Sequence, residues 1–510
     1  MIVRKPHRLL IANRGEIASR IIRGAKDEGW HTIAIYSEAD ASQHHVLLAD
    51  EAHPVGPAPA HLSYLDLDRI LEVAVATKAT HVHPGYGFFS ENPDFVQRVS
   101  EAGLKLIGPT ADAIRAMGDK VAARNAAEAA HVPLVPGSPP LPADPEVAVE
   151  YAEKIGYPVL IKAAFGGGGK GMRLCHDSAE LQAALAVTRG EAGRSFGNDT
   201  IFIERALLEA RHVEIQILCD EHGNGVYLGE RECSIQRRHQ KLIEETPCVV
   251  LEPATRKQMG EAAVRLALDI GYTNAATVEF LLDRNGNPYF LEMNTRLQVE
   301  HPITEMVTGI DLVRAQLRIA DGEPLPWTQD EIHPKGAAIE CRIIAEDASA
   351  GFVPQSGPIH YARLPQGPGV RNDVGFLPGR EVSIHYDSMI GKLITWGNDR
   401  EEARIRMLRA LDEYLIEGVR TNVDFQRWAI SHPEFIAGNT YTRFIDEFFR
   451  PEMLDRPDLE DDAAIIAAVA TFRHRMGSSA PFAREGGAPS AGVHAPRISA
   501  WKRARRWSGR

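Results

Sequence analysis

The chain has 510 residues, 44% of them hydrophobic and 25% charged, a length and composition that indicate a globular protein of three or four structural units. Its 57 Lys and Arg against 69 Asp and Glu give a formal net charge of −12, which argues against binding to nucleic acid. The five cysteines lack the close spacing of a zinc site and suggest reduced thiols in the cytoplasm, and the very short apolar run at the start of the chain predicts neither a signal peptide nor a membrane span.

The first predicted unit covers residues 1–115 and begins with a β-α-β pattern. A short apolar run at Arg8–Ala12 predicts a strand, and the spacing of Ile17–Lys26 predicts a helix. Trp30–Ser37 has the pattern of a second buried strand. Further strand patterns follow at 79–83 and 104–107. The alternation predicts an open α/β sheet.

The second predicted unit covers residues 116–330. The patterns predict a helix at 111–130, a glycine-rich α/β unit at about 135–205, an antiparallel sheet with helices over 211–320, and a helix at Thr304–Ala320. Thr110 or Asp112 is the expected cap of the first helix. The last helix carries an apolar stripe, which we interpret as part of the core.

The remaining chain is predicted to form an α+β unit and an extended end. The unit covers residues 335–446, with strands around Ala337–Ile344 and Glu381–His385. Residues 447–510 are expected to hold a helical segment, a flexible linker rich in Gly, Ser, Ala and Pro at 477–496, and a basic tail with two tryptophans. The tail is either a disordered end or a tethered docking segment for a partner.

A glycine-rich stretch at residues 162–172 has the features of a phosphate-binding loop. Lys162 ends a strand pattern, four consecutive glycines follow at 166–169, and Lys170 lies within the loop. Glycines let the backbone approach a ligand and direct N–H groups at phosphate oxygens. The Gly-Lys-Ser/Thr of a Walker A motif is missing, and a flexible turn is the alternative interpretation.

Residues 277–302 carry the clearest chemical pattern. Asn285-Gly286 predicts a two-residue β-turn, and a hairpin folded there places Glu279 directly opposite Glu292. Their Cβ atoms would lie about 4.5–5.5 Å apart, which is unfavourable for like charges unless a cation lies between them. Carboxylate ligation suits Mg²⁺ or Mn²⁺. The register depends on the absence of a bulge.

Polar residues continue at every second position as far as Glu300. In an extended chain they would share one face, and an exposed strand face is the alternative. They are Glu292, Asn294, Arg296, Gln298 and Glu300. The segments 211–217 and 234–241 are also polar; the second concentrates hydrogen-bond donors and suits an anion, although a solvated edge strand or a charged loop would explain either segment.

Together these motifs closely resemble biotin carboxylase, the subunit found in acetyl-CoA, propionyl-CoA, methylcrotonyl-CoA and pyruvate carboxylases. The resemblance runs from about residue 5 to 446. The motifs are NRGEIA (13–18), HPGYGFFSEN (83–92), MGDK (117–120), KAAFGGGGKGM (162–172), RHVEIQIL (211–218), ERECSIQRRHQK (230–241), EMNTRLQVEHP (292–302) and ECRIIAED (340–347). The resemblance implies the ATP-grasp fold, with a Rossmann-like N-terminal domain, a glycine-rich lid and a C-terminal biotin carboxylase domain.

The resemblance also implies roles for individual residues. The ATP contacts are Lys120, Lys162, Gly168, Gly169, Glu204, Arg205, Ala206, Leu207, His212 and His239. The metal site is Glu279, Glu292 and Asn294, in agreement with the hairpin argument. The bicarbonate pocket is Lys241, Arg296, Gln298, Val299 and Glu300. Glu300 is the implied general base, Arg342 the stabiliser of the biotin enolate, and Tyr86 and Gly87 lie near biotin.

The cofactors implied are ATP and Mg²⁺ or Mn²⁺, with biotin as a protein-bound substrate. No Ala-Met-Lys-Met biotinylation motif occurs in the chain, so we expect it to work with a separate biotin carboxyl carrier protein and a carboxyltransferase subunit. The resemblance implies a homodimer, and the cysteine usage predicts a cytoplasmic location. An acetyl-CoA or other acyl-CoA carboxylase of fatty acid biosynthesis and a pyruvate carboxylase both fit, so the acceptor stays open. The alternatives are another ATP-grasp ligase and a catalytically silent scaffold subunit.

Overall fold

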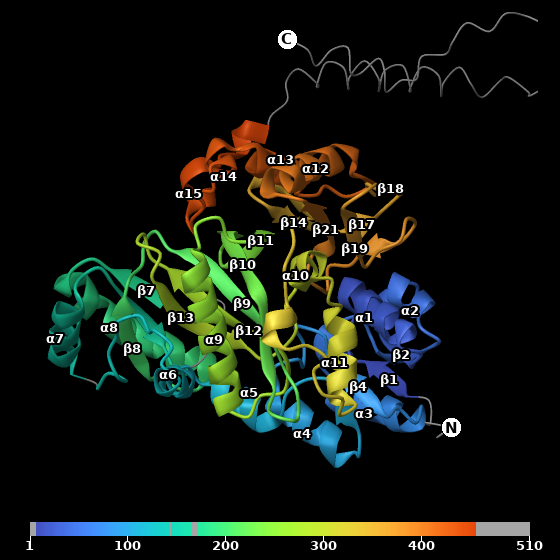
Figure 1. Cartoon of the computed structure of the whole chain (residues 1–510), viewed down its shortest axis with the longest axis horizontal. Helices are drawn as coiled ribbons and strands as arrows, with labels where there is room; N and C mark the ends of the chain where they lie inside the picture. Colours follow the sequence, from blue (N-terminus) through green and yellow to red (C-terminus); the bar gives the residue numbers. More distant parts are fainter. Residues whose placement is uncertain (1–6, 143, 165–171, 455–510) are drawn as a thin grey trace, which may run out of the picture. The chain divides into compact units, whose positions relative to one another are not determined.

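The first five strands form a parallel sheet in the order β3-β2-β1-β4-β5 (Figure 1). Strand order reverses between β1 and β4, and such switch points place ligands at the carboxyl ends of the strands. The side chain of Asn13, just after β1, donates to the backbone carbonyls of Pro84 at 2.6 Å and Tyr86 at 2.8 Å. The loop after β4 is thereby fixed at the reversal point, which confirms the expected open α/β start.

This first part contains the predicted strands and helix, each to within a few residues, together with three further helices and one further strand that were not predicted. The elements are β1 (Arg8–Ile11), α1 (Gly15–Asp27), β2 (His31–Ser37), α2 (His44–Leu48), β3 (Glu51–Gly56), α3 (Leu67–Ala76), β4 (His81–His83), α4 (Pro93–Glu101) and β5 (Lys105–Leu106). Leu9, Leu10 and Ile11 are fully buried, because β1 lies inside the sheet between two neighbours.

The computed structural model describes residues 7–142, 144–164 and 172–454. Gly168 and Gly169 of the glycine loop, and the linker and basic tail within 455–510, lie outside the described residues. Within the described part of the chain, no helix combines the length and the apolar character needed to cross a lipid bilayer.

A small antiparallel sheet in the order β7-β6-β8 carries the residues on either side of the glycine loop. Helices α7 and α8 pack against each other and against strands of this sheet. The elements are α7 (Pro145–Ile155), β6 (Val159–Ala163), β7 (Met172–Cys175), α8 (Ser178–Phe196) and β8 (Ile201–Arg205). The strand that ends with Lys162 and Ala163 confirms the predicted strand before the loop.

An eight-stranded antiparallel sheet in the order β13-β12-β9-β10-β11-β14-β21-β19 forms the centre of the described chain. Its strands are β9 (Arg211–Cys219), β10 (Gly225–Arg237), β11 (Gln240–Thr246), β12 (Asn274–Leu282), β13 (Pro288–Asn294), β14 (Ala337–Ile344), β19 (Val370–Val374) and β21 (Met389–Gly397). Strand β14 has the bounds expected from the sequence. It pairs with β11, so the sheet is continuous across the predicted boundary near residue 330, and the four-part division of the chain stays a prediction.

Helices cover this sheet. Helix α9 (Pro253–Asp269) contacts β9 and β10, and α12 (Arg400–Glu413) contacts β21 and β14. The other elements after residue 344 are β15 (Glu346–Asp347), β16 (Val353–Pro354), β17 (Gly357–Pro358), β18 (Tyr361–Arg363), β20 (Glu381–Val382), β22 (Leu415–Glu417), α13 (Val423–Ser431), α14 (Pro433–Ile436) and α15 (Phe444–Phe448).

Two predicted helices are each divided in two. The helix expected over 111–130 is α5 (Ala111–Gly118) and α6 (Lys120–Ala129), because the Asp119 side chain accepts from the backbone N–H groups that start α6. Thr110 is the cap of α5, as one of the two expected alternatives.

The helix expected over 304–320 is also two helices. They are α10 (His301–Thr308) and α11 (Leu312–Ala320). Gly309 ends α10 with φ +72°, a left-handed conformation that favours glycine and stops the helix. The apolar stripe nevertheless faces the core as expected, with Val313 and Leu317 fully buried.

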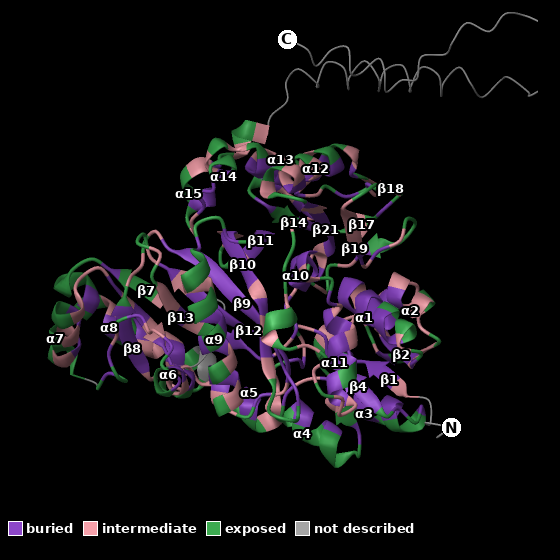
Figure 2. Cartoon of the chain, in the orientation of Figure 1, coloured by how far each residue is buried: buried purple, intermediate pink, exposed green. Residues whose placement is uncertain are grey.

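Every residue of strand β9 is buried (Figure 2). The alternating polar side chains of residues 211–217 are therefore inside the protein, and the solvated-edge alternative for this segment is wrong. β9 pairs with β10 on one side and β12 on the other. Buried polar groups require partners, so this strand directs attention to what its polar side chains contact.

Candidate active site

The hairpin of β12 and β13 has the predicted pairing at its functional end and a different turn. Glu279 lies opposite Glu292, as expected. The loop between the strands is longer than two residues and is held by Asp283, whose side chain accepts from the backbone of Asn285 and Asn287, each at 2.9 Å. Pairs next to the turn are offset by one residue, and a bulge beyond Glu279 restores the expected register.

The register places three carboxylates in one row across the sheet. Glu292 on β13 faces Glu279 on β12, which faces Glu214 on β9, which faces Arg231 on β10. Like charges side by side are destabilising unless cations offset them. Arg231 is fully buried, and its Nε donates to Glu214 Oε1 at 2.6 Å.

Lys241 from β11 offsets the remaining charge of this row. Its Nζ donates to Glu214 Oε2 at 2.5 Å, to Glu279 Oε1 at 2.8 Å and to Glu300 Oε1 at 2.7 Å. Burial alone would lower the pKa of Lys241, but the three carboxylates hold it well above its usual range. An ammonium group therefore lies where the sequence argument required a cation beside Glu279.

Glu300 lies between two cations just before α10. Arg342 on β14 donates from Nη2 to Glu300 Oε2 at 3.0 Å and from Nε to Glu244 Oε1 at 2.6 Å. Burial opposes ionisation of Glu300, yet Lys241 and Arg342 hold its pKa well below its usual range. We call Glu214, Lys241, Glu244, Glu279, Glu300 and Arg342 the central network.

The central network leaves part of its carboxyl groups without partners. Burial, only partly offset by Arg342, raises the pKa of Glu244 to about 7. Glu340 faces Glu244 across β11 and β14, and burial raises its pKa well above the usual range. Among the described residues, neither oxygen of Glu340 nor Oε2 of Glu244 has a hydrogen-bond partner. The carboxyl groups in and beside the central network therefore differ widely in pKa, from well below the usual range at Glu300 to well above it at Glu340.

The segment after β13 does not continue as a strand. β13 ends at Asn294, and Pro302 lies in the first turn of α10, a position that favours the start of a helix. The expectation of an extended chain to Glu300 is therefore wrong. The side chains still converge, because Arg296 donates to Asn294 Oδ1 at 3.1 Å and to Gln298 Oε1 at 3.0 Å.

Polar side chains surround Glu279 and leave Glu292 accessible. Asn294 Nδ2 and Gln298 Nε2 donate to Glu279 Oε1 at 2.8 Å and 3.1 Å, and His212 Nε2 lies 2.8 Å from Glu279 Oε2. Glu292 is exposed, while desolvation and then the charge of Glu279 raise its pKa. Two carboxylates and an amide oxygen are suitable ligands for a hard divalent cation.

Five of the expected nucleotide contacts, Lys162 and residues 204–207, lie on or directly after strands of the small sheet. Glu204 is bound by Lys162 Nζ at 2.5 Å and by Arg124 Nη1 at 2.6 Å. The backbone N–H groups of Arg205 and Ala206 donate to carbonyls of the same chain at 2.9 Å each, and Leu207 is half-buried. Lys120 is the first residue of α6; burial lowers its pKa, against the attraction of Glu292.

His239 is exposed at the tip of the β10–β11 hairpin. Arg238 and His239 form a two-residue turn with φ of +50° and +66°. Turns of this kind usually contain glycine or asparagine, and strained backbone at non-glycine residues is found mainly at functional sites. The position suits a ligand contact, and the role of His239 stays a prediction.

The loop with Tyr86 and Gly87 lies near Lys392, which binds the segment before α10. Lys392 on β21 donates to the Val299 carbonyl at 2.8 Å, lies 3.2 Å from Glu16 and lies 6.0 Å from the centre of the Tyr86 ring. Gly87 has φ +67°, which requires glycine-like freedom in this loop. Lys392 thus links α1, the β4 loop and the segment before α10.

Sequence reasoning missed several residues of the site. They are Glu91, Arg124, Arg231, Glu244, Glu340 and Lys392. Polar residues alternate with apolar ones along β9, as expected of a strand with one polar face, but not along β10 and β11, which carry Arg231 and Glu244. Which of them meet depends on strand order, which no local pattern gives.

Known families match nearly the whole described chain. Three family models cover it: the biotin carboxylase N-terminal domain at residues 5–114, the carbamoyl-phosphate synthase L chain ATP-binding domain at 119–328, and the biotin carboxylase C-terminal domain at 340–447.

The propionyl-CoA carboxylase alpha chain of Ruegeria pomeroyi is 48% identical over 491 residues, covering 92% of this chain and 72% of that protein. A pyruvate carboxylase subunit from Methanothermobacter thermautotrophicus is 48% identical over 486 residues, covering 92% of this chain and 99% of that protein.

A solved structure extends the likeness to three dimensions. The biotin carboxylase domain dimer of Hydrogenobacter thermophilus 2-oxoglutarate carboxylase, in complex with MgADP, ADP and bicarbonate, has a TM-score of 0.83 and 43% identity. The match covers 88% of this chain and 98% of that one. The predicted ATP-grasp fold is confirmed, and the chain belongs to the biotin carboxylase family.

Proposed function

We propose that this chain catalyses the ATP- and bicarbonate-dependent carboxylation of biotin, the first half-reaction of a biotin-dependent carboxylase. The observation that carries the proposal is the position of Glu300, bound by Lys241 on one side and Arg342 on the other. A carboxylate held ionised beside two cations suits an anionic substrate that must lose a proton. Family membership supports the same reaction.

In this proposal bicarbonate binds beside Lys241, Arg296, Gln298, Val299 and Glu300. Lys241 and Arg296 offset its negative charge, and the Gln298 amide orients it. Glu300 is the general base that takes the proton of bicarbonate. The low pKa of Glu300 keeps it unprotonated at neutral pH, so no prior deprotonation is required.

We place ATP between the small sheet and the central network. The proposed contacts are Lys120, Lys162, Gly168, Gly169, Glu204, Arg205, Ala206, Leu207, His212 and His239. Glu279, Glu292 and Asn294 would hold Mg²⁺, or Mn²⁺ in its place, which neutralises charge on the phosphates when bound. Residues 135–205 would close over the nucleotide and exclude water.

The reaction then needs two transfers. Bicarbonate oxygen attacks the γ-phosphorus of ATP, the bond to the ADP oxygen breaks, and carboxyphosphate forms with loss of the bicarbonate proton to Glu300. Carboxyphosphate yields carbon dioxide and phosphate, and the phosphate accepts the ureido proton of biotin. The biotin nitrogen bonds to carbon dioxide, while Arg342 offsets the charge on the ureido oxygen. Tyr86 and Gly87 would border the bound biotin.

The partners belong to the same proposal. We place biotin on a separate carrier protein that serves a carboxyltransferase subunit. We also propose that this chain is a homodimer in the cytoplasm. The biotin carboxylase domain dimer of the 2-oxoglutarate carboxylase relative supports the homodimer. Its relatives belong to propionyl-CoA, pyruvate and 2-oxoglutarate carboxylases at similar identity, so the acceptor stays open.

Deleting 478–510 should weaken co-purification with these subunits if the tail docks them, and should leave free-biotin carboxylation unchanged.

The test is ATP hydrolysis by the purified full chain. ADP release should require Mg²⁺ and bicarbonate and should rise with high free biotin. Hydrolysis that ignores bicarbonate and biotin would assign the chain to another ATP-grasp ligase. Nucleotide binding without any hydrolysis under all these conditions would favour the scaffold alternative.

A further inference from the structure

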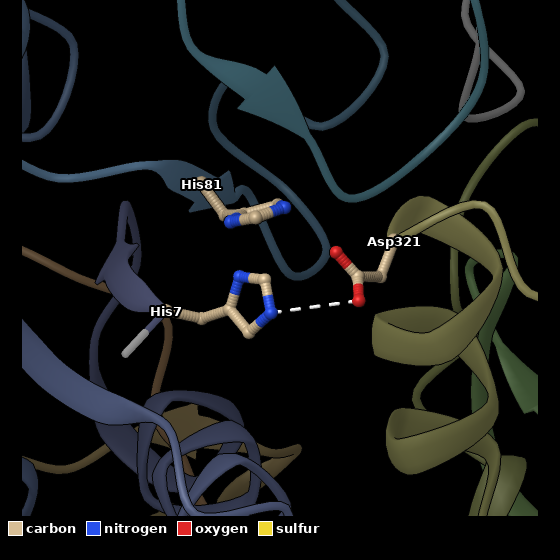
Figure 3. Close-up of side chains that lie close together, drawn as sticks. All are labelled: His7, His81 and Asp321. Carbon is tan, nitrogen blue, oxygen red and sulfur yellow. Dashed lines mark ion pairs between the residues drawn. The ribbon is translucent and has the colours of Figure 1, made fainter. Parts of the chain in front are cut away.

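Two histidines and an aspartate meet at the amino end of the parallel sheet (Figure 3). His7 precedes β1, His81 is the first residue of β4, and Asp321 follows α11. One ligand-capable atom from each lies within 4.8 Å of the others. The catalytic residues proposed above come from other segments, and the loop with Tyr86 leaves the opposite, carboxyl end of β4. No role in the proposed reaction accounts for this cluster.

His81 presents a ring nitrogen, Nε2, that no described group uses. Its other ring nitrogen, Nδ1, lies 2.9 Å from the Thr80 hydroxyl, which also accepts from the Arg8 backbone N–H at 2.9 Å. A metal ion at Nε2 requires the proton on Nδ1, and the Thr80 oxygen lies where it can accept that proton. His81 is only 4% exposed, and among the described residues its Nε2 has no hydrogen-bond partner.

The cluster also has the charge and rigidity of a cation site. His7 Nε2 lies 3.4 Å from Asp321 Oδ2, close to the roughly 3.3–3.4 Å that separates two ligands on a tetrahedral Zn²⁺. Asp321 lies at the carboxyl end of α11, where the helix dipole favours a cation. The centroid of the Trp30 ring lies 4.5 Å from that of the His7 ring and 4.7 Å from that of the His81 ring. This packing limits the rotation of both imidazoles.

Burial and then the neighbouring His7 lower the pKa of His81 to about 4. The ammonium of Lys105 is a nearby positive charge that opposes the binding of a cation, and it also lowers the pKa of His81. Its ammonium is held by the Ala320 carbonyl at 3.1 Å, which makes Lys105 a useful position for testing the site.

We propose that His7, His81 and Asp321 bind a divalent transition metal of the Zn²⁺ class. Two imidazole nitrogens and one carboxylate oxygen suit Zn²⁺ and leave a position for water. The ion would join the first sheet to α11, two segments about 240 residues apart in sequence, and would stabilise the folded chain by mass action.

Zn²⁺ binding to the chelator-treated full chain tests the site, with Mg²⁺ in large excess to occupy carboxylate-rich sites. A competing chromophoric chelator gives the affinity, and thermal unfolding gives the stability. Wild type should bind Zn²⁺ and unfold at a higher temperature with it. His7→Gln, His81→Gln and Asp321→Asn should each weaken binding by about tenfold or more and lose the temperature shift. Lys105→Met should bind Zn²⁺ more tightly than wild type.

His53→Gln is the matched control, because His53 lies on β3, at the far edge of the same sheet, 3.4 Å from the carboxylate of Glu51, and is in none of the clusters of possible metal ligands among the described residues. It should bind Zn²⁺ like wild type. Asp321→Asn and His7→Gln alter partly exposed side chains, so they test the site even if the buried His81 variant fails to fold. Unchanged Zn²⁺ affinity in both variants, or no Zn²⁺-dependent stabilisation of wild type, would overturn the proposal.

Discussion

Two buried charge networks in this molecule differ in how well their carboxyl groups are matched. In the second, which we call the Arg20–Arg371 network, Arg20 donates to Glu305 at 2.7 Å, while Arg371 donates to Glu305 at 2.7 Å and to Asp373 at 2.8 Å. Burial opposes ionisation, yet the arginines lower the pKa of Glu305 and bring that of Asp373 to about 2. Both carboxylates are therefore firmly ionised.

In the central network, by contrast, the pKa values of the carboxyl groups diverge. The pKa of Glu300 lies well below its usual range, whereas burial raises that of Glu244 to about 7. Neighbouring carboxyl groups with divergent pKa values are typical of acid–base sites. Burial and ion pairing alone therefore do not distinguish the two networks. They differ in whether every carboxyl group is matched by a cation. We expect the central network to serve the reaction and the Arg20–Arg371 network to stabilise the fold.

The largest expected effect is the loss of turnover in Glu300→Gln. Glutamine keeps the shape and loses the proton acceptor, so the turnover number for bicarbonate-dependent ATP hydrolysis should fall about 10²- to 10⁴-fold. ATP affinity, measured by equilibrium binding, should stay near the wild-type value. Near-normal turnover would remove Glu300 from its proposed role.

The reverse pattern is expected for Asp373→Asn in the Arg20–Arg371 network. The substitution removes one carboxylate from a buried pair and should lower the free energy of unfolding by about 3 kcal/mol, measured by urea denaturation. Turnover of the folded enzyme should change little. A large loss of turnover at unchanged stability would erase the distinction between the networks.

The two networks should also respond oppositely to pH. The pKa of Glu244 is raised from 4.5 to about 7, so its stabilising contribution is full below 4.5 and is lost as the pH rises through about 7. The pKa of Asp373 is lowered from 3.8 to about 2, so its contribution is present above 3.8 and is lost as the pH falls through about 2.

Unfolding free energies of Glu244→Gln and Asp373→Asn, each compared with wild type across this range, measure the two contributions. Within its own window each difference should change by up to about 1.4 kcal/mol per pH unit. Parallel pH profiles for the two variants would contradict the assigned pKa directions.

A smaller effect is expected at Glu292, the exposed member of the glutamate row. Glu292→Gln should raise the Mg²⁺ concentration for half-maximal activity about tenfold, equivalent to about 1.4 kcal/mol. Turnover at saturating Mg²⁺ should recover most of its wild-type value. The same Mg²⁺ requirement in variant and wild type would exclude Glu292 as a metal ligand.

Local patterns predicted β1, β2, β4 and β5 of the first sheet, β14 and the facing pair Glu279 and Glu292. That register was correct although the turn was not, because a bulge compensated for the longer loop. Asp119 and Gly309 ended helices that periodicity alone made continuous. Hydrophobic spacing records which face is buried, whereas a single capping residue decides where a helix stops.

The central network was less predictable because its contacts are long-range. Lys241 meets Glu300, 59 residues away, and Arg342 meets Glu244, 98 residues away. The contact between Arg342 and Glu244 depends on β11 lying beside β14, which is a property of the sheet order, and the contact between Lys241 and Glu300 depends on where the segment before α10 lies relative to β11. Sequence resemblance named Lys241, Glu300 and Arg342, but only the fold brings in Glu244.

Transfer of labelled bicarbonate carbon to free biotin tests the central claim most directly. The account predicts acid-labile labelled carboxybiotin that requires ATP and Mg²⁺ with the wild-type chain. It also predicts that Glu300→Gln loses most of the product while Asp373→Asn retains it per folded molecule. Absence of labelled biotin with the wild-type chain, under conditions in which it binds ATP and Mg²⁺, would contradict the assignment of the central network to biotin carboxylation.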